Sequence, residues 1–462
     1  MSSAAVVVEQ FTKKKAAIML AGIAVVLLAL AIFGGHAGIV FAILAGLMLT
    51  GMPISISLGL TVLVFLFFFS NVPTEAVALK LFTGIEKFEI MAIPFFILAG
   101  NFLTHGGVAK RMINFATALV GHFNGGLALG GVVACALFAA VSGSSPATVV
   151  AIGSILLPAM VKQGYPMKFG VGVIGTSGGL GILIPPSIVM VIYAVSVNES
   201  IGKLFIAGII PGLLLAGVLM GVTWMVAKKR GYPKQPRASI GTIFSTFRES
   251  FWGLFLIVVV IGGIYSGLFT PTEAAAMSAV YAFFVSVFVY KDLGFKDMPK
   301  VLLSSASMSA MLLYIITNAV LFSFLLTSEQ VPQNLTAWMT SLGLNQVTFL
   351  IFVNILLLAA GNFMEPSSIL LITAPLLFPV AMELGVDPIH LGVLMTVNME
   401  IGMITPPVGL NLYVASGISR LGLTETTKAC LPWILVMLVY LTLITYVPAI
   451  SLWLPKIGRA HV

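Results

Sequence analysis

Apolar runs long enough to cross a lipid bilayer recur along the whole chain. They include 16–33, 127–141, 207–227, 252–269, 273–290 and 432–454. Hydrophobic residues make up 59% of the 462 residues and charged residues only 8%. Because backbone groups in lipid must be paired within the chain, such runs must be helical. The sequence therefore predicts an all-α polytopic membrane protein with roughly ten to twelve crossings, since a spanning helix needs about 20 apolar residues.

The basic residues are gathered in loops. The net charge is +8, and Lys and Arg cluster at 13–15, 228–237 and 291–300. Short loops rich in Lys and Arg lie on the cytoplasmic side of a membrane. This pattern indicates a lipid bilayer and not a nucleic acid as the partner. We interpret 1–37 as a cytoplasmic N-terminus with an uncleaved extra helix, and 228–250 as a cytoplasmic linker.

The chain contains an internal repeat. A shift of 221 residues places Pro158 on Pro379, Gly164 on Gly385, Gly181 on Gly402, Pro185 on Pro406, Pro186 on Pro407 and Pro211 on Pro432. Repeated halves with matching interrupted helices are typical of secondary transporters. A first copy that begins outside and ends inside at residue 228 has an odd number of crossings. We therefore expect inverted repeats at 38–227 and 251–462.

Each copy has a polar stretch between two short apolar arms. The stretches are "SGSSPAT" (142–148) and "GNFMEPSS" (361–368). Glycine permits positive φ, and the residue before a proline avoids the helical conformation. The arms of the first stretch are 127–141 and 149–160, and those of the second are 347–360 and 369–382. Arms of this length are short for a crossing, so the sequence predicts two re-entrant helical hairpins with these stretches as tips.

Each copy also has a helix broken by a double proline, in "GILIPPS" (181–187) and "GMITPPV" (402–408). Proline removes a backbone donor and breaks a helix interior. Unwinding turns carbonyls toward a cation, while the new helix start presents donors to an anion. We expect each hairpin tip to meet the break of its own copy and to form a cation site there. The alternative is two kinked helices without a ligand.

Acidic and amide side chains at membrane depth point to function. Glu365 lies in the second tip and is the stronger candidate for the site. Glu400 precedes the second break. Three roles are open for it: it lines the site, lies at the membrane interface or forms an ion pair. Asn398 and Asn411 flank this break, where amides also serve as contacts between helices. No GxxxxGK[ST] or HExxH motif occurs, so we expect no enzyme; an intramembrane enzyme is the alternative class.

Four motifs resemble the large membrane subunit of TRAP transporters, the DctM-like family of tripartite ATP-independent periplasmic carriers. They are "AIPFFILAGNFLTHGG" (92–107), "SGSSPATVVAIGSILLPAM" (142–160), "GGLGILIPPS" (178–187) and "GLFTPTEAAA" (267–276). The resemblance covers about 38–455. It implies an elevator-type carrier of the bacterial inner membrane that imports an organic acid, such as a C4-dicarboxylate or sialic acid. Its implied partners are a small four-helix membrane subunit and a periplasmic substrate-binding protein.

The resemblance also implies at least two coupling Na⁺ ions and the residues that hold them. The first Na⁺ site would use Ser142, Ser144, Gly181, Ile184 and Pro186, and the second Gly361 and its tip with Gly402, Thr405 and Val408. The substrate would lie between the tips near Ser145, Ser187 and Glu365, to which we add Asn398. The extra helix at 16–33 departs from short family members and is similar to the connecting helix of fused versions. A self-sufficient Na⁺-coupled dicarboxylate or anion carrier of the same hairpin type is the alternative function.

Overall fold

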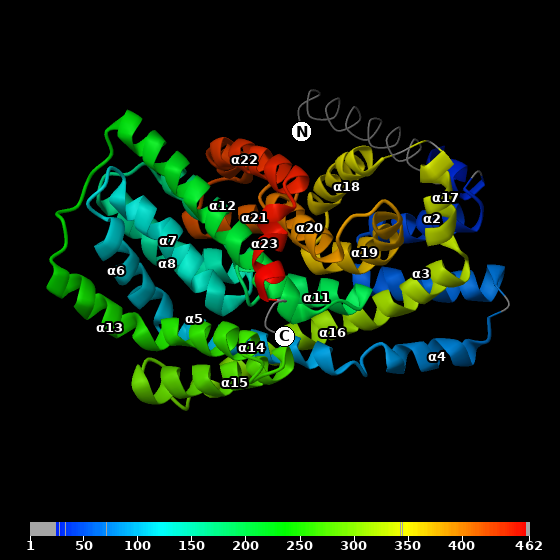
Figure 1. Cartoon of the computed structure of the whole chain (residues 1–462), viewed down its shortest axis with the longest axis horizontal. Coiled ribbons are helices and arrows are strands. Elements are labelled where there is room, and N and C mark those ends of the chain that lie inside the picture. The colour runs from blue at the N-terminus through cyan, green and yellow to red at the C-terminus, as the bar shows by residue number, and fades with distance from the viewer. Residues whose placement is uncertain are drawn as a thin grey trace, which may run out of the picture. The chain divides into compact units, whose positions relative to one another are not determined.

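The computed structural model describes residues 25–26, 28–32, 34–70, 72–341, 343 and 345–458. All regular elements among them are helices (Figure 1). Nine of the described helical segments are long and apolar enough to cross a membrane, and four shorter apolar helices accompany them. This confirms the polytopic α-helical class. The predicted cytoplasmic N-terminus and most of the extra helix at 16–33 lie outside the described residues.

The chain divides into two compact units. The first comprises the described residues up to Ile85 together with Leu313–Trp338. It contains α2 (Gly35–Leu49), α3 (Ile54–Phe69), α4 (Thr74–Thr83), the second half of α16 (Met298–Ser328) and most of α17 (Val331–Ser341). A Cβ built on Gly59 would lie 2.3 Å from the side-chain oxygen of Asn318. This glycine therefore allows α3 to approach α16 closely, as small residues do between membrane helices.

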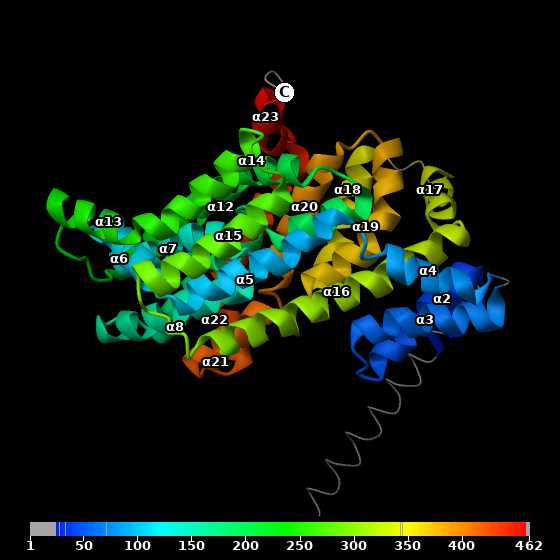
Figure 2. The ribbon, with the colours of Figure 1, turned by 90° about the horizontal axis from the view of Figure 1, so that it is seen from below.

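The second unit comprises Glu86–Leu312 and Met339–Val462 and holds every candidate site residue. Its first elements are η1 (Phe88–Met91), α5 (Ala92–His105) and α6 (Val108–Val120). The first hairpin and the first broken helix come next. After them the chain forms α12 (Ile201–Arg230), α13 (Ile240–Ile257), η2 (Val258–Gly262), α14 (Gly263–Tyr265), α15 (Pro271–Phe284) and η3 (Val285–Val289). The unit ends with α22 (Leu423–Tyr446) and α23 (Ala449–Gly458). Helix α5 packs along α15, as Figure 2 shows, and α6 packs on α13.

Local sequence explains where the helices around the basic linker begin and end. Helix α12 ends at Gly231, whose φ of +65° suits glycine. Ser239 caps α13 by accepting a hydrogen bond from Thr242. Only 231–239 is therefore non-helical within the predicted linker 228–250. The repeat boundaries 38–227 and 251–462 stay a prediction.

Both predicted helical hairpins are present as helix pairs, but their tips are shorter than expected, and their re-entrance into a membrane stays a prediction. The first joins α7 (Gly126–Ser142) to α8 (Ser145–Lys162), and the second joins α18 (Gln346–Gly361) to α19 (Pro366–Glu383) (Figure 1). The irregular tips are 143–144 and 362–365, not 142–148 and 361–368. The reason is that a proline in the first helical turn is compatible with a helix start, since its missing donor would be unpaired there. Arms α8 and α19 are each long and apolar enough to cross a membrane, so the expectation of short arms was wrong for them.

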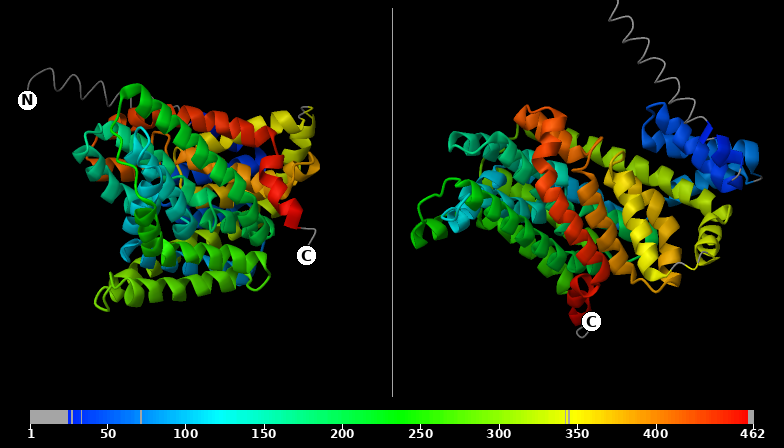
Figure 3. Two further views of the ribbon diagram at one scale, coloured as in Figure 1. Left: turned by 60° about the vertical axis from the view of Figure 1, so that its left-hand side comes forward. Right: turned by 90° about the horizontal axis from the view of Figure 1, so that it is seen from above.

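Both double prolines interrupt a helix, as predicted. The first break follows α9 (Met167–Ser177) and α10 (Leu180–Leu183) and precedes α11 (Ile188–Val197). The second lies between α20 (Pro388–Gly402) and α21 (Leu410–Ser419). Both Pro–Pro peptide bonds are cis. Figure 3 shows α22 beside α20, so the second broken helix lies inside the unit.

Candidate functional site

The first tip lies directly against the first break. A Cβ built on Gly143 would be 2.8 Å from the carbonyl oxygen of Pro186, and one on Gly181 would be 2.6 Å from that of Ser144. The amide of Ile188 donates to the carbonyl of Gly143 at 3.5 Å. Such distances exclude any side chain between the two backbones. The predicted convergence of tip and break in the first copy is therefore observed.

Hydroxyl groups surround this contact. Ser142 Oγ lies 2.9 Å from Thr148 Oγ1, and Thr148 donates to the carbonyl of Ser144 at 2.9 Å. Both hydroxyl residues are buried. Ile184 belongs to the same break, but its side chain packs against the position of Gly212 on α12, so only its backbone is available to a ligand. Thr148 was not among the predicted site residues, although its hydroxyl within "SGSSPAT" was a usable signal.

The second tip meets the second break in the same manner. A Cβ built on Gly361 would lie 2.9 Å from the Cα of Gly402, and one on Gly402 2.7 Å from the Cα of Gly361. Val408 donates its amide to the carbonyl of Asn362 at 3.0 Å. Thr405 Oγ1 donates to the carbonyl of Ile401 at 2.7 Å. These residues of the predicted second cation site thus lie together.

The two breaks differ in their exposure. The prolines of the first break, 185 and 186, are buried. The prolines of the second break, 406 and 407, are exposed, and Thr405 and Val408 are half-buried. The second break is therefore the more exposed of the two.

Glu365 caps its own helix. Its carboxylate accepts hydrogen bonds from the amides of Ser367 at 3.2 Å and Ser368 at 2.8 Å, and from the hydroxyl of Ser368 at 2.7 Å. An acidic side chain at a helix start satisfies unpaired amides and interacts favourably with the helix dipole. The start of α8 has no such side-chain cap. The backbone amides at the start of α19 are thus paired with a side chain of the protein itself, whereas those at the start of α8 have no side-chain partner.

The helix after each break packs on the hairpin of the other copy. Helix α21 contacts α8, and α11 contacts α19. At the first of these contacts the side-chain amide of Asn411 donates to the Ser145 hydroxyl at 2.6 Å, with both residues fully buried. Sequence reasoning noted Asn411 as a flanking amide but did not connect it with Ser145. It therefore joins the second broken helix to the first tip.

Two other predicted substrate residues make internal hydrogen bonds. The Ser187 hydroxyl donates to the carbonyl of Ile182 and accepts a hydrogen bond from the amide of Met190. Ser187 thereby caps the start of α11. Asn398 donates to the Asn354 side chain at 2.9 Å. Asn354 in turn donates to Thr445 at 2.9 Å. These contacts give Asn398 the second role considered for it, a link between helices.

Several buried oxygens near the tips and breaks accept no hydrogen bond within the described part of the chain. They are the amide oxygens of Asn362, Asn398 and Asn411, the hydroxyl of Ser177 and both carboxylate oxygens of Glu400. A buried oxygen without a donor is costly. Hard cations are bound by such carboxylate, amide and carbonyl oxygens. The chemical type of these oxygens therefore suits a hard cation.

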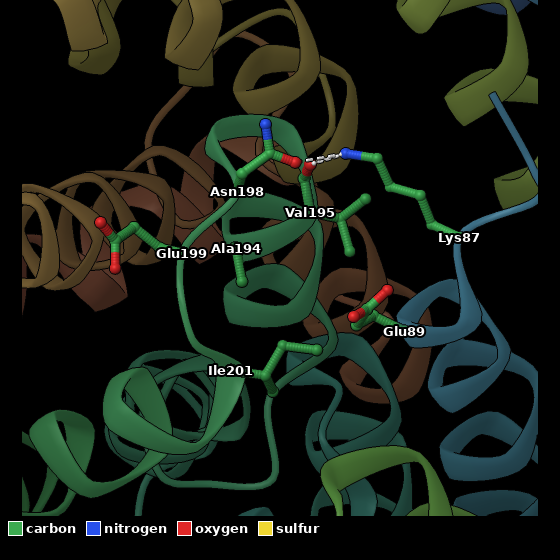
Figure 4. Close-up of a pocket in the computed structure, with 7 residues that line it drawn as sticks. All are labelled: Lys87, Glu89, Ala194, Val195, Asn198, Glu199 and Ile201. Atoms are coloured by element: carbon green, nitrogen blue, oxygen red, sulfur yellow. Dashed lines mark hydrogen bonds between the residues drawn. The ribbon is translucent and has the colours of Figure 1, made fainter. Parts of the chain in front are cut away.

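A separate cavity of about 150 Å³ lies at the far end of α11 (Figure 4). It is lined by Lys87, Glu89 and residues of the segment 194–201. The Lys87 amine donates to the carbonyl of Val195 at 2.9 Å and to the Asn198 side chain at 2.6 Å. A cation at a helix C-terminus stabilises the last carbonyls. Lys87 therefore ties the segment before α5 to the end of α11.

Comparison with known proteins gives consistent matches over most of the chain. The sequence profile of the family described as "Tripartite ATP-independent periplasmic transporter, DctM component" matches residues 41–450. The chain is 70% identical over 433 residues to the C4-dicarboxylate TRAP transporter large permease protein DctM of Rhodobacter capsulatus, covering 91% of this chain and 98% of that protein. It is 56% identical over 400 residues to the protein of the same name from Pseudomonas aeruginosa, covering 87% and 94%.

More distant proteins share the fold. The sialic acid TRAP transporter large permease protein SiaM of Vibrio cholerae is 37% identical over 412 residues, covering 89% of this chain and 96% of that protein. Among solved structures, the YdaH transporter of Alcanivorax borkumensis matches with a TM-score of 0.58 at 18% identity, covering 85% of this chain and 91% of that one. At this identity the match concerns the fold alone. The profile match and the close relatives show that this chain belongs to the DctM family of large permease components of TRAP transporters.

Proposed function

We propose that the chain is the large permease subunit of a Na⁺-coupled secondary transporter that imports an organic acid across the bacterial inner membrane. The observation that carries this proposal is the backbone contact between tip and break, made in both halves of one unit. Buried side-chain oxygens that accept no hydrogen bond within the described residues lie in or near the tips and breaks. Such sites suit small cations that are carried with a substrate.

A C4-dicarboxylate is the substrate that we favour over sialic acid. The relative at 70% identity is named for C4-dicarboxylates, whereas the relative named for sialic acid is 37% identical. The α8 start offers the substrate a helix N-terminus without a side-chain cap, and such a terminus suits a carboxylate. Ser145 and Asn411 would orient the substrate there, because they meet at this helix start.

Two coupling Na⁺ ions would occupy the tip–break contacts. In the first, the backbone of Gly181, Ile184 and Pro186 would supply carbonyl oxygens beside Ser142 and Ser144. In the second, the Gly361 tip would bind an ion with Gly402, Thr405 and Val408. Neutral oxygens suit a monovalent cargo, since a tightly held ion would not be released on the far side.

We further propose inverted repeats and an elevator-type movement of the hairpins with their breaks. The order of hairpin, broken helix and long helix occurs twice. The crossed packing of α21 on α8 and of α11 on α19 supports joint movement, because it ties each half to the other. A movement of this kind alternates access around a fixed site.

A small four-helix membrane subunit and a periplasmic substrate-binding protein would complete the transporter. The family is defined as one component of a tripartite system. Delivery by a binding protein raises the local substrate concentration, so a weak pocket in the permease suffices. The alternative, a self-sufficient carrier of the same hairpin type, differs in needing neither partner.

The test is uptake by proteoliposomes with an imposed inward Na⁺ gradient. Radiolabelled C4-dicarboxylate and sialic acid are compared, with the chain alone and with the two partners added. We expect C4-dicarboxylate uptake that needs the gradient and both partners. Concentrative uptake by the chain alone would instead identify the self-sufficient carrier, and uptake that ignores Na⁺ would refute the cation sites.

Site-directed variants test the two cation sites separately. Ser142→Ala and Thr405→Ala each remove one hydroxyl oxygen from one proposed site. Each should raise the Na⁺ concentration for half-maximal uptake, because the ion loses an oxygen neighbour. Thr442→Ala, which removes an exposed hydroxyl of α22 that bonds to its own helix, is the matched control. Equal Na⁺ dependence of all three variants would count against the assignment.

A further inference from the structure

Glu400 is a fully buried acid for which the proposed function has no role so far. Its relative exposure is 0%, and neither carboxylate oxygen has a hydrogen-bond partner within the described residues. No ion pair joins it to a basic side chain in that part of the chain. The structure thus excludes two roles considered for it, an interfacial and an ion-paired residue. An ionised carboxylate at this depth needs a compensating positive charge, and without one it takes up a proton and becomes neutral.

The side chain of Glu400 faces the equivalent position of the other copy. A Cβ built on Gly179 would lie 2.5 Å from Glu400 Cγ and 2.6 Å from Oε1. The shift of 221 residues that relates the copies places Gly179 on Glu400. One copy therefore supplies the carboxylate, and the other supplies the space that accommodates it. A side chain at residue 179 would collide with the carboxylate.

This position is adjacent in the chain to both candidate cation sites. Gly179 precedes by two residues Gly181, which touches the first tip, and Glu400 precedes by two residues Gly402, which touches the second. Two residues of chain span at most about 7 Å, so with the reach of the side chain each of these two glycines lies within roughly 12 Å of the carboxylate. The proposed ligands of both sites are backbone and hydroxyl oxygens without full charge. Two bound Na⁺ ions would therefore bring two positive charges close to Glu400, the one fully buried carboxyl group among the described residues. Glu365, at the second tip, is half-buried and accepts hydrogen bonds from its own helix.

The basic side chains on the helices packed against α20 form no ion pair with Glu400 among the described residues; they are Lys203 and 228–230 on α12, Lys428 on α22 and Lys456 on α23. The packed helices are α10, α11, α12, α18, α19, α22 and α23. The titratable side chain among them that interacts electrostatically with Glu400 is Tyr440. Its hydroxyl donates to the carbonyl of Pro211 at 2.7 Å, and a neutral phenol carries no charge that would offset a carboxylate. When Glu400 is ionised, the compensating positive charge therefore comes from the cargo, and in its absence a proton neutralises the carboxyl group.

We propose that Glu400 is the shared counter-charge of both Na⁺ sites, which raises the affinity of each ion by electrostatic attraction without ligating it. The proposal rests on the Na⁺-coupled function proposed above. At no more than about 12 Å and an effective dielectric constant of about 20, this attraction changes a binding constant by about tenfold or more. Because the charge is shared, its removal weakens both sites, and the number of bound ions stays the same.

The test is Na⁺ binding by purified protein without substrate, followed as thermal stabilisation in a Na⁺ titration against choline. Glu400→Gln keeps the shape and removes the charge. We expect it to raise the half-saturating Na⁺ concentration at least about tenfold and to leave the Hill coefficient unchanged. Glu383→Gln, at an exposed residue ending α19, should match the wild type. Uptake in proteoliposomes should show the same shift.

The outcomes separate this proposal from the proposed function. Absence of Na⁺ stabilisation in the wild type would refute the Na⁺-coupled function itself. Stabilisation of the wild type and of Glu400→Gln at the same Na⁺ concentration would refute only the counter-charge. Glu400→Asp retains the charge and should stay within a few-fold of the wild type. If Glu400→Gln does not fold, a tenfold weakening in Glu400→Asp would overturn the proposal, because shape and not charge would then matter.

Discussion

Replacing Gly402 by alanine tests the contact between the second tip and its break. Gly402 ends helix α20, and its added Cβ would lie 2.7 Å from the Cα of Gly361. The two backbones must move apart by about 0.7 Å to reach 3.4 Å, where ordinary van der Waals contact begins. No flexible side chain can yield here, because the obstacle is backbone.

The size of the effect follows from a comparison with Gly417→Ala. Gly417 lies inside α21, is exposed, and has no atom within 4 Å of its built Cβ. Both variants gain helix propensity of about 0.5–1 kcal/mol. Only Gly402→Ala also suffers overpacking, which costs about 1–3 kcal/mol. The difference between the two free energies of unfolding therefore isolates the packing cost, and the two variants should change stability in opposite directions.

Equilibrium unfolding in mixed micelles, with increasing denaturing detergent, measures this difference. Gly402→Ala should unfold at lower detergent than the wild type, and Gly417→Ala at equal or higher detergent. Na⁺ titrations of the same samples should show weaker stabilisation of Gly402→Ala, since its proposed ion ligands are displaced. If Gly402→Ala proves as stable as Gly417→Ala, tip and break are not in tight backbone contact.

Three further predictions concern the second unit: two test contacts within it, and one tests its orientation in the membrane. Asn411→Ala should destabilise the protein by about 1–3 kcal/mol, measured by the same unfolding assay, because it leaves the buried hydroxyl of Ser145 without its partner. Lys87→Met keeps the alkyl stem but removes the amine that caps α11, and it should cost about 1 kcal/mol; unchanged stability would show that solvent replaces the amine. Single cysteines at Lys162 and Glu383, both exposed, should label from opposite sides of the membrane, and labelling from one side would end the inverted-repeat proposal.

The hairpins and breaks were predictable because glycine and proline act locally. A proline cannot donate within a helix, so the double prolines had to interrupt their helices wherever the chain placed them. The tips were predicted too long for the same local reason. Pro146 and Pro366 were taken to lie within irregular chain, whereas each lies in the first turn of a helix, where a proline is favoured.

The contact of Glu365 illustrates a local signal that was available but not used. An acidic residue directly before a proline that starts an apolar run is typical of a helix N-cap. Its depth in the membrane instead suggested an open functional carboxylate. The structure places it on the amides of its own helix. The position of a charged residue at membrane depth thus pointed to a functional role. The capping pattern pointed to the contact that Glu365 makes, with the amides of its own helix.

Contacts between the two copies lay beyond the sequence. Neither the hydrogen bond from Asn411 to Ser145 nor the packing of Glu400 against Gly179 follows from periodicity. Both join residues more than 200 positions apart, and both depend on how the second copy lies against the first. A repeat establishes which positions correspond, but it does not establish which of them touch. Only the packed unit shows that two corresponding positions, 179 and 400, face each other.

Differences between the copies are therefore as informative as their likeness. The start of α19 is capped by a carboxylate, whereas the start of α8 is uncapped and contacts Asn411. If both starts were open, two anion sites of equal strength would compete for one substrate. Capping one hairpin helix from within leaves one of the two hairpin helix starts without a side-chain cap and keeps the carboxylate of Glu365 beside the second tip. In the proposed transporter, two similar halves would thus bind similar ions at both breaks while presenting the organic acid with one orientation.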